Sequence, residues 1–216
     1  MKSRLLVILF LFFALDESKS QTVSDLFNHS SVKIVWLGID YSHARFIGDF
    51  AQFAEAGSTG PSTLKSKYFP AWNGLVLSEP KKYDIAGMFR KENVLYKINT
   101  ITKINAVAPI GNMMDEENDP NYSKQDIQKF INKYSFEEKQ GIGILFVAES
   151  LNKYREKGKY HVVAINLSNK NILLHEVMEG KAGGFGLRNY WAKTISDIII
   201  QIRDNKFRAW KNEYGG

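Results

Sequence analysis

Three apolar segments in the last third of the chain predict consecutive β-strands. In the middle one, His161, Val163 and Ile165 alternate with Val162 and Ala164, as in a strand with two different faces. Its polar connection to the third segment contains asparagines, which tolerate the positive φ of a tight hairpin. The connection to the first segment is longer and charged. We expect three antiparallel strands at 142–150, 160–167 and 172–178, joined by 151–159 and 168–171.

The first half of the mature chain predicts one strand followed by helices. Residues 32–39 are β-branched and almost wholly apolar, and predict a buried strand that ends at Asp40. Apolar residues recur at near-helical spacing in 44–56, which predicts a helix. A second helix is expected within 62–72, where Pro70 must end or kink it, and a short one within 84–90.

The segment 94–105 fits two patterns. Val94, Tyr96 and Ile98 alternate as in a strand, whereas the isoleucines of this segment also recur at helical spacing. Its β-branched residues favour the strand. The polar stretch 111–121 predicts a loop. Ser123, with Asp126 three residues later, predicts the capping box of a helix that reaches about Lys133.

The chain ends in an amphipathic helix that follows a glycine-rich segment. Its apolar stripe predicts packing against the sheet, and consists of Trp191, Ile195, Ile198, Ile199 and Ile202, with Phe207 and Trp210 as a continuation. The predicted fold class is therefore α+β, in a single domain over residues 21–216. We expect a mixed sheet with a C-terminal three-stranded antiparallel meander, covered by helices that include the C-terminal helix.

Residues 1–20 have the organisation of a secretory signal peptide. Lys2 and Arg4 precede the apolar run 5–15, and small residues follow at Ser18 and Ser20. The run is too short to span a bilayer, which needs about 20 apolar residues, and no later segment is long enough either. We expect cleavage after Ser20 and a periplasmic or secreted protein; the alternative is an uncleaved anchor.

Composition narrows the chemistry of this 216-residue chain. Because it has no cysteine, disulfides, a cysteine nucleophile and thiolate metal sites are excluded. Loss of the leader, with its three basic and two acidic residues, leaves a net charge of +5. A basic exported protein favours an anionic glycan, lipid or protein of the envelope as its partner, rather than nucleic acid. No sequence motif indicates a cofactor.

The first candidate site is the polar segment that follows the first predicted strand. Asp40 and His43 have the residue types of an acid–base pair, and Arg45 would hold an anion. In open sheets with parallel strands, ligand sites gather at strand ends. The alternative is that Asp40 or Ser42 caps the next helix while His43 and Arg45 face water.

The second candidate site is the glycine-rich segment before the C-terminal helix. Gly184 and Gly186 would expose backbone N–H groups at the helix N-terminus, and Arg188 would add a charged fork for an anion. The segment is no dinucleotide fingerprint, because Asn189 stands at the third glycine position. The alternative is a turn whose aromatic neighbours simply pack in the core.

The histidines do not predict a metal site. No two share the spacing that places both on one helix face, although His161 and His175 can approach each other across the hairpin. On adjacent strand positions, however, His175 and Glu176 point to opposite faces. A serine-hydrolase elbow is also missing.

Two segments carry a family resemblance. Gly141-Ile-Gly-Ile-Leu-Phe-Val-Ala-Glu-Ser150 and Ala182-Gly-Gly-Phe-Gly-Leu-Arg-Asn-Tyr-Trp-Ala192 resemble uncharacterised exported bacterial proteins. The order of elements is similar to small α/β domains of envelope proteins, such as the N-terminal domain of the Tol-system translocation protein and the outer-membrane activators of peptidoglycan synthases. The resemblance implies fold and compartment but no catalytic residue. The lipid-attachment cysteine of the lipoprotein members is missing here.

Two functions remain open from the sequence. The favoured one is a non-enzymatic envelope protein that binds a partner protein or an anionic envelope component. The other is a small-ligand-binding protein or hydrolase-type enzyme, with a site near Asp40, His43 and the Gly183–Trp191 loop.

Overall fold

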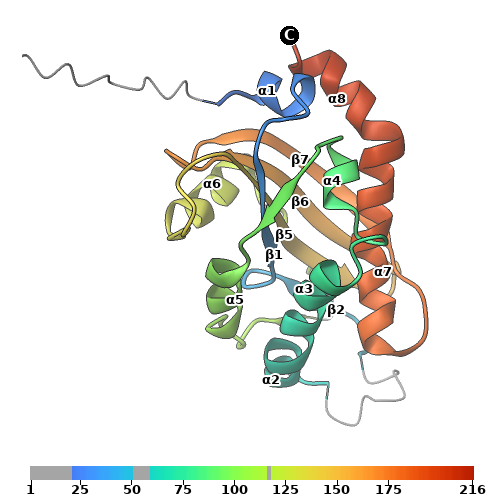
Figure 1. Cartoon of the computed structure of the whole chain (residues 1–216). Helices are drawn as coiled ribbons and strands as arrows, with labels where there is room; N and C mark the ends of the chain where they lie inside the picture. The colour runs from blue at the N-terminus through green and yellow to red at the C-terminus, as the bar shows by residue number, and fades with distance from the viewer. Residues whose placement is uncertain (1–20, 51–58, 116–117) are drawn as a thin grey trace, which may run out of the picture.

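The computed structural model describes residues 21–50, 59–115 and 118–216, so the leader expected over 1–20 lies outside the described residues. Within these ranges, strands and helices follow one another around one central sheet (Figure 1). No helix there is long and apolar enough to cross a bilayer. The strands are β1 (Ile34–Asp40), β2 (Arg45–Ile47), β3 (Val94–Tyr96), β4 (Met114–Asp115), β5 (Ile142–Asn152), β6 (Lys157–Asn166) and β7 (Ile172–Lys181). The helices are α1 (Val23–Asn28), α2 (Pro61–Thr63), α3 (Phe69–Ser78), α4 (Ile85–Met88), α5 (Asn99–Ala106), α6 (Lys124–Asn132), α7 (Gly186–Gln201) and α8 (Phe207–Tyr214), with π-helical turns η1 (Leu64–Tyr68) and η2 (Ile202–Lys206).

Strand β5 lies at the centre of the sheet. One of its edges pairs antiparallel with β6, which in turn pairs with β7. The other edge pairs in parallel with β1 along Ile142–Val147 and with β2 along Ser150–Asn152. Strands β1 and β2 therefore form one interrupted strand, and residues 41–44 leave the ladder between them. Strands β3 and β4 extend the sheet in parallel beyond β1 and β2.

The predicted fold class, α+β with a C-terminal antiparallel meander, is wrong. The fold is α/β, because five of the seven described strands, β1 to β5, form the parallel part of the sheet. Strand β5 does not open a separate meander but joins the parallel part to β6 and β7. The pattern within the last third of the chain could not reveal this, because the parallel partners of β5 come from the first half.

Two local predictions are wrong for a shared reason. The helix expected over 44–56 is replaced, where described, by β2, and residues 51–58 lie outside the described residues. The strand expected over 94–105 is limited to β3, and helix α5 occupies most of the rest. In both segments the apolar spacing fits a strand as well as a helix. Pairing with distant strands decides which residues become a strand.

The turns near β6 differ from expectation in detail. Strands β5 and β6 extend through most of 151–159 and meet at a short turn, rather than at a long connection. In the 168–171 hairpin the residue with positive φ is Lys170, at 64°, and not an asparagine.

The predicted capping box of α6 is confirmed: Ser123 Oγ accepts the Asp126 N–H, and the Asp126 carboxylate accepts the Ser123 N–H, both at 3.2 Å.

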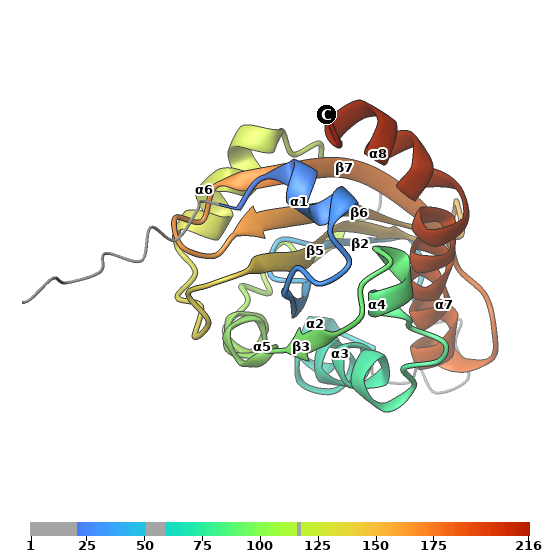
Figure 2. The same cartoon turned by 45° about the horizontal axis from the view of Figure 1, so that its top comes forward.

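Each face of the sheet carries its own apolar core. Helices α3, α7 and α8 cover one face, where Trp36, Phe146 and Ile195 are buried (Figure 2). Helices α5 and α6 cover part of the other face, where Leu37 and Val163 are buried. Strand positions that alternate along β1 belong to different cores, as the pleat of a strand requires.

Two asparagine side chains replace a missing strand beside the end of β1. Strand β3 pairs only with the first part of β1, up to Trp36. Beyond it, Asn73 of α3 accepts the Ile39 N–H at 2.7 Å and donates to the Ile39 carbonyl at 2.9 Å. Asn105 of α5 accepts the Tyr41 N–H and donates to the same Ile39 carbonyl, both at 2.8 Å. The buried backbone is thus satisfied, and both helices are fixed against β1.

Candidate functional site

A basic pocket lies at the N-terminal end of α7, beside α3. It has a volume of about 300 Å³, and Lys67, Arg188 and Asn189 contribute its polar side chains. None of the described residues that line it is acidic. The full lining is Lys67, Tyr68, Ala71, Phe185, Gly186, Arg188 and Asn189.

The backbone before α7 is shaped by glycines. Gly184 and Gly186 have φ values of 103° and 76°, in the left-handed region that side chains disfavour. Phe185 is the N-cap, and none of the described side chains caps the first turn of α7. The first amides of this helix therefore have no side-chain acceptor among the described residues, and the helix dipole adds positive potential at the same end.

Contacts with α3 fix the position of the pocket walls. Trp72, which is fully buried, donates its indole N–H to the Arg188 carbonyl at 2.9 Å. The Arg188 side chain itself is exposed, and within the described residues it donates one long hydrogen bond, of 3.4 Å, to the Asn189 side chain. Lys67 is also exposed, with its ammonium group 5.2 Å from the centre of the Tyr68 ring. Two cationic side chains from separate helical segments are thus available to an anion.

Phe185 gives this pocket an apolar rim. Its side chain is 83% exposed, which is unusual for a residue of this size. An exposed aromatic side chain next to cationic groups is a common composition at binding surfaces. The arrangement can hold an anionic group with an adjacent apolar part, and its described lining includes no serine, histidine or carboxylate.

The first candidate site is centred on a buried carboxylate, whereas the second contains an exposed arginine. Asp40 is fully buried; its carboxylate accepts the Ser42 N–H at 2.7 Å and the Tyr134 hydroxyl. Burial, followed by the negative charge of Asp40, raises the pKa of Tyr134 far above its usual value, so this hydroxyl stays protonated. Asp40 thus holds the interruption between β1 and β2 in place.

His43 and Arg45 lie next to this buried pair. The His43 ring stacks on Phe130 of α6, with centroids 3.6 Å apart and planes 7° apart. Burial lowers the pKa of His43, while the charge of Asp40 opposes that shift. Arg45 opens β2 and is half-buried.

The two predicted site segments are not brought together. Asp40 packs with Tyr134, which belongs to the core on the α6 face. The segment that contains Gly184, Gly186 and Arg188 packs through Trp72 and Trp191 with the core on the opposite face. A single site made of Asp40, His43 and Arg188 is therefore not formed.

An ionic array that the sequence analysis missed lies on the α6 face. Glu149 of β5 is fully buried and accepts His161 Nε2–H at 2.7 Å and the Tyr122 N–H at 3.0 Å. Its other oxygen lies 2.5 Å from Lys159 Nζ. His161, also fully buried, has its Nδ1 2.8 Å from His175 Nε2. The predicted approach of the two histidines across the hairpin is confirmed.

The pKa values in this array follow from burial and from its hydrogen bonds. Burial alone would raise the pKa of Glu149. The hydrogen bonds from His161, Lys159 and the Tyr122 N–H outweigh burial, so the pKa lies below its usual value and the carboxylate is held ionised. Burial, followed by the neighbouring His161 and Lys124, lowers the pKa of His175 to about 4. The array is therefore a negative carboxylate that contacts the imidazole of His161 and the ammonium group of Lys159, and His161 in turn contacts the imidazole of His175.

One sequence signal pointed to this array. Glu149 is the single charged residue in the otherwise apolar and small segment 141–150, which is buried on both faces of a central strand. A carboxylate at such a position requires partners, and His161 on the next strand is the nearest candidate. Within the described ranges, no group of three or more histidines and carboxylates is arranged to hold a metal ion.

A scan against protein-family models and a search of curated proteins found no match to this chain. The family resemblance of its two segments therefore stays a prediction.

Proposed function

We propose that the chain is an exported binding protein that holds an anionic group of an envelope partner in the basic pocket at the start of α7. The carrying observation is the convergence of Lys67, Arg188 and the uncapped first turn of α7 on one pocket without an acidic lining residue. Charge-assisted hydrogen bonds from arginine and from helix N-termini are well suited to phosphate and carboxylate groups.

A binding role is favoured over catalysis by the state of the carboxylates and histidines. Asp40, Glu149 and His161 are fully buried, and their polar atoms are engaged with one another or with neighbouring groups. An acid or base that acts on a substrate must reach it within hydrogen-bond distance. These groups serve the packing of the α6 face instead.

The proposal is tested by titrating tripolyphosphate, as a compact anionic probe, into the chain that begins at Gln21. The double variant Lys67→Ala/Arg188→Ala should raise the dissociation constant at least about tenfold, because two charge-assisted contacts are lost. The matched control Arg208→Ala/Lys211→Ala removes the same charge from exposed positions on α8. Equal weakening in both variants would mean that net charge alone attracts the probe, and would refute the pocket.

Export is tested separately, by the mass of the protein recovered from the envelope fraction of its host. A mass that begins at Gln21 supports removal of a leader at Ser20. Protein that still carries Met1 and is absent from the envelope fraction would overturn the proposed location.

A further inference from the structure

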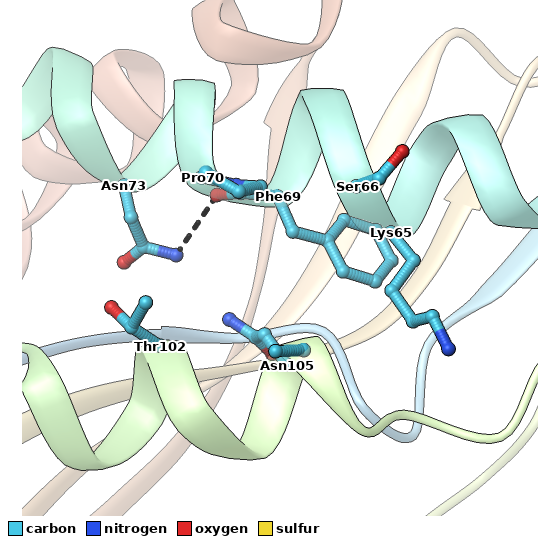
Figure 3. A pocket seen from close by; sticks show the side chains of 8 residues that line it. Lys65, Ser66, Phe69, Pro70, Asn73, Thr102 and Asn105 are labelled. Atoms are coloured by element: carbon cyan, nitrogen blue, oxygen red, sulfur yellow. Dashed lines mark hydrogen bonds between the residues drawn. The ribbon is translucent and has the colours of Figure 1, made fainter.

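A second pocket lies between α3 and α5, at the place where both helices reach the end of β1. Its volume is about 230 Å³, and it shares no lining residue with the basic pocket. Figure 3 shows Lys65, Ser66, Phe69 and Pro70 on one side, and Thr102 and Asn105 on the other. The complete lining is Lys65, Ser66, Phe69, Pro70, Asn73, Thr102, Asn105 and Ala106.

The shape of this pocket follows from a break in the helical pattern. The Phe69 N–H reaches back to the Leu64 carbonyl, five residues earlier, and forms the π-helical turn η1. Pro70 has no amide hydrogen, so the Ser66 carbonyl has no donor four residues ahead of it. Such π-turns are rare and occur frequently at functional sites.

Asn105 presents an unused donor to this pocket. The whole residue is only 3% exposed. One amide hydrogen is used by the Ile39 carbonyl, and the oxygen accepts the Tyr41 N–H. The second amide hydrogen has no acceptor in the part of the chain that the structure describes. In Figure 3 the amide nitrogen of Asn105 faces the space between the two helices.

Asn73 does not offer a donor in the same way. Both of its amide hydrogens are used, by the carbonyls of Ile39 and Phe69 at 2.9 and 3.3 Å. A buried donor without an acceptor is costly, and it is therefore rare in folded proteins. A ligand oxygen in the pocket would give the second amide hydrogen of Asn105 an acceptor.

Three of the other lining residues favour an apolar body in the ligand. The ring of Phe69, the ring of Pro70 and the methyl group of Ala106 line the space. Because one water molecule takes about 30 Å³ of liquid volume, the pocket has room for roughly eight non-hydrogen atoms. That is the size of one small ring with a short substituent.

We infer that this pocket binds a small molecule with a compact apolar body and one carbonyl-type oxygen, which accepts the free N–H of Asn105. The apolar body lies against Phe69 and Pro70. Ketone, amide and carboxylate compounds share this chemistry. The site is independent of the anion-binding pocket, and either can fail without the other.

Ligand-observed NMR with two isosteric probes tests the inference. Acetophenone carries the required oxygen, whereas α-methylstyrene has a methylene group in its place and the same planar shape. Acetophenone should bind about threefold to tenfold more tightly, the range that one hydrogen bond contributes. Equal affinity for the two probes would overturn the role of Asn105.

A pocket-filling variant locates the site. Ala106→Leu places a larger apolar side chain in the pocket from an exposed helix position and leaves Asn105 unchanged. It should abolish acetophenone binding, whereas the control Ala209→Leu, exposed on α8, should keep it. Absence of acetophenone binding to the unmodified chain, or undiminished binding to Ala106→Leu, would refute the inference.

Discussion

Replacing Glu149 by glutamine should cost the protein much of its stability. The carboxylate is fully buried and is approached by three donors: His161 at 2.7 Å, the Tyr122 N–H at 3.0 Å and Lys159 at 2.5 Å. Glutamine has one acceptor oxygen, and its NH₂ group would face a donor. At least one donor loses its acceptor, and the charge of Lys159 loses its partner.

The size of this stability loss follows from how deeply Glu149 and Lys159 are buried. Breaking a fully buried ion pair costs about 3–5 kcal/mol, and a lost hydrogen bond to a charged group about 1.5–3 kcal/mol. The Lys159 side chain is 25% exposed, so water can partly replace its partner. We therefore expect a loss of about 3 kcal/mol in the free energy of unfolding at pH 7.

Urea unfolding at pH 7 measures this loss, with Glu179→Gln as the matched control. Glu179 also forms an ion pair at 2.5 Å, with Lys157, but both side chains are about 40% exposed, at 39% and 43%. Such pairs contribute about 0–1 kcal/mol. If the free energy of unfolding of Glu149→Gln stays within about 1 kcal/mol of that of the unmodified protein, at an unchanged dependence on urea, the array does not stabilise the fold.

Acid should destabilise the fold before the carboxylates titrate. The pKa of His175 is lowered to about 4 by burial and by the neighbouring His161 and Lys124, so between pH 6.5 and about 4 the unfolded chain binds a proton that the folded chain does not. Stability should fall over this window by about 1–2 kcal/mol after allowance for solvent screening, and urea midpoints for His175→Asn should lack that part of the slope. Replacing Asn73 by alanine should cost about 2–3 kcal/mol, because the buried Ile39 N–H then has no acceptor. In thermal or urea unfolding, a loss as small as that of the exposed Asn93→Ala would contradict this role of Asn73.

Local structure was predictable where one pattern dominated. The segments that became β5, β6 and β7 and the helix capped by Ser123 are continuous or strictly periodic, and pairing or capping near in the chain suffices to form them. The parallel partners of β5 were not predictable in this way. They depend on strands from the first half of the chain, and one of them is interrupted between Asp40 and Arg45.

The site residues, too, were predictable only where a local sequence pattern indicates them. Gly184, Gly186 and Arg188 could be singled out from the sequence because glycines before a helix have a local meaning; Gly186 and Arg188 line the basic pocket, whereas Gly184 does not. Lys67 comes from the π-helical turn η1, which is distant in the sequence, and the packing of Trp72 against the Arg188 backbone helps to bring it to this site. The unused donor of Asn105 was equally hidden, because it depends on where β3 stops pairing with β1.

The central claim is that an anion is held at the start of α7, and an amide-resolved titration with inorganic phosphate tests it most directly. In ¹H–¹⁵N spectra of the chain from Gln21, the largest saturable shifts should fall on the amides of Gly186, Leu187 and Arg188, and should vanish in Lys67→Ala/Arg188→Ala. Shifts that spread over the whole basic surface without saturation, or that centre on another segment, would contradict the account.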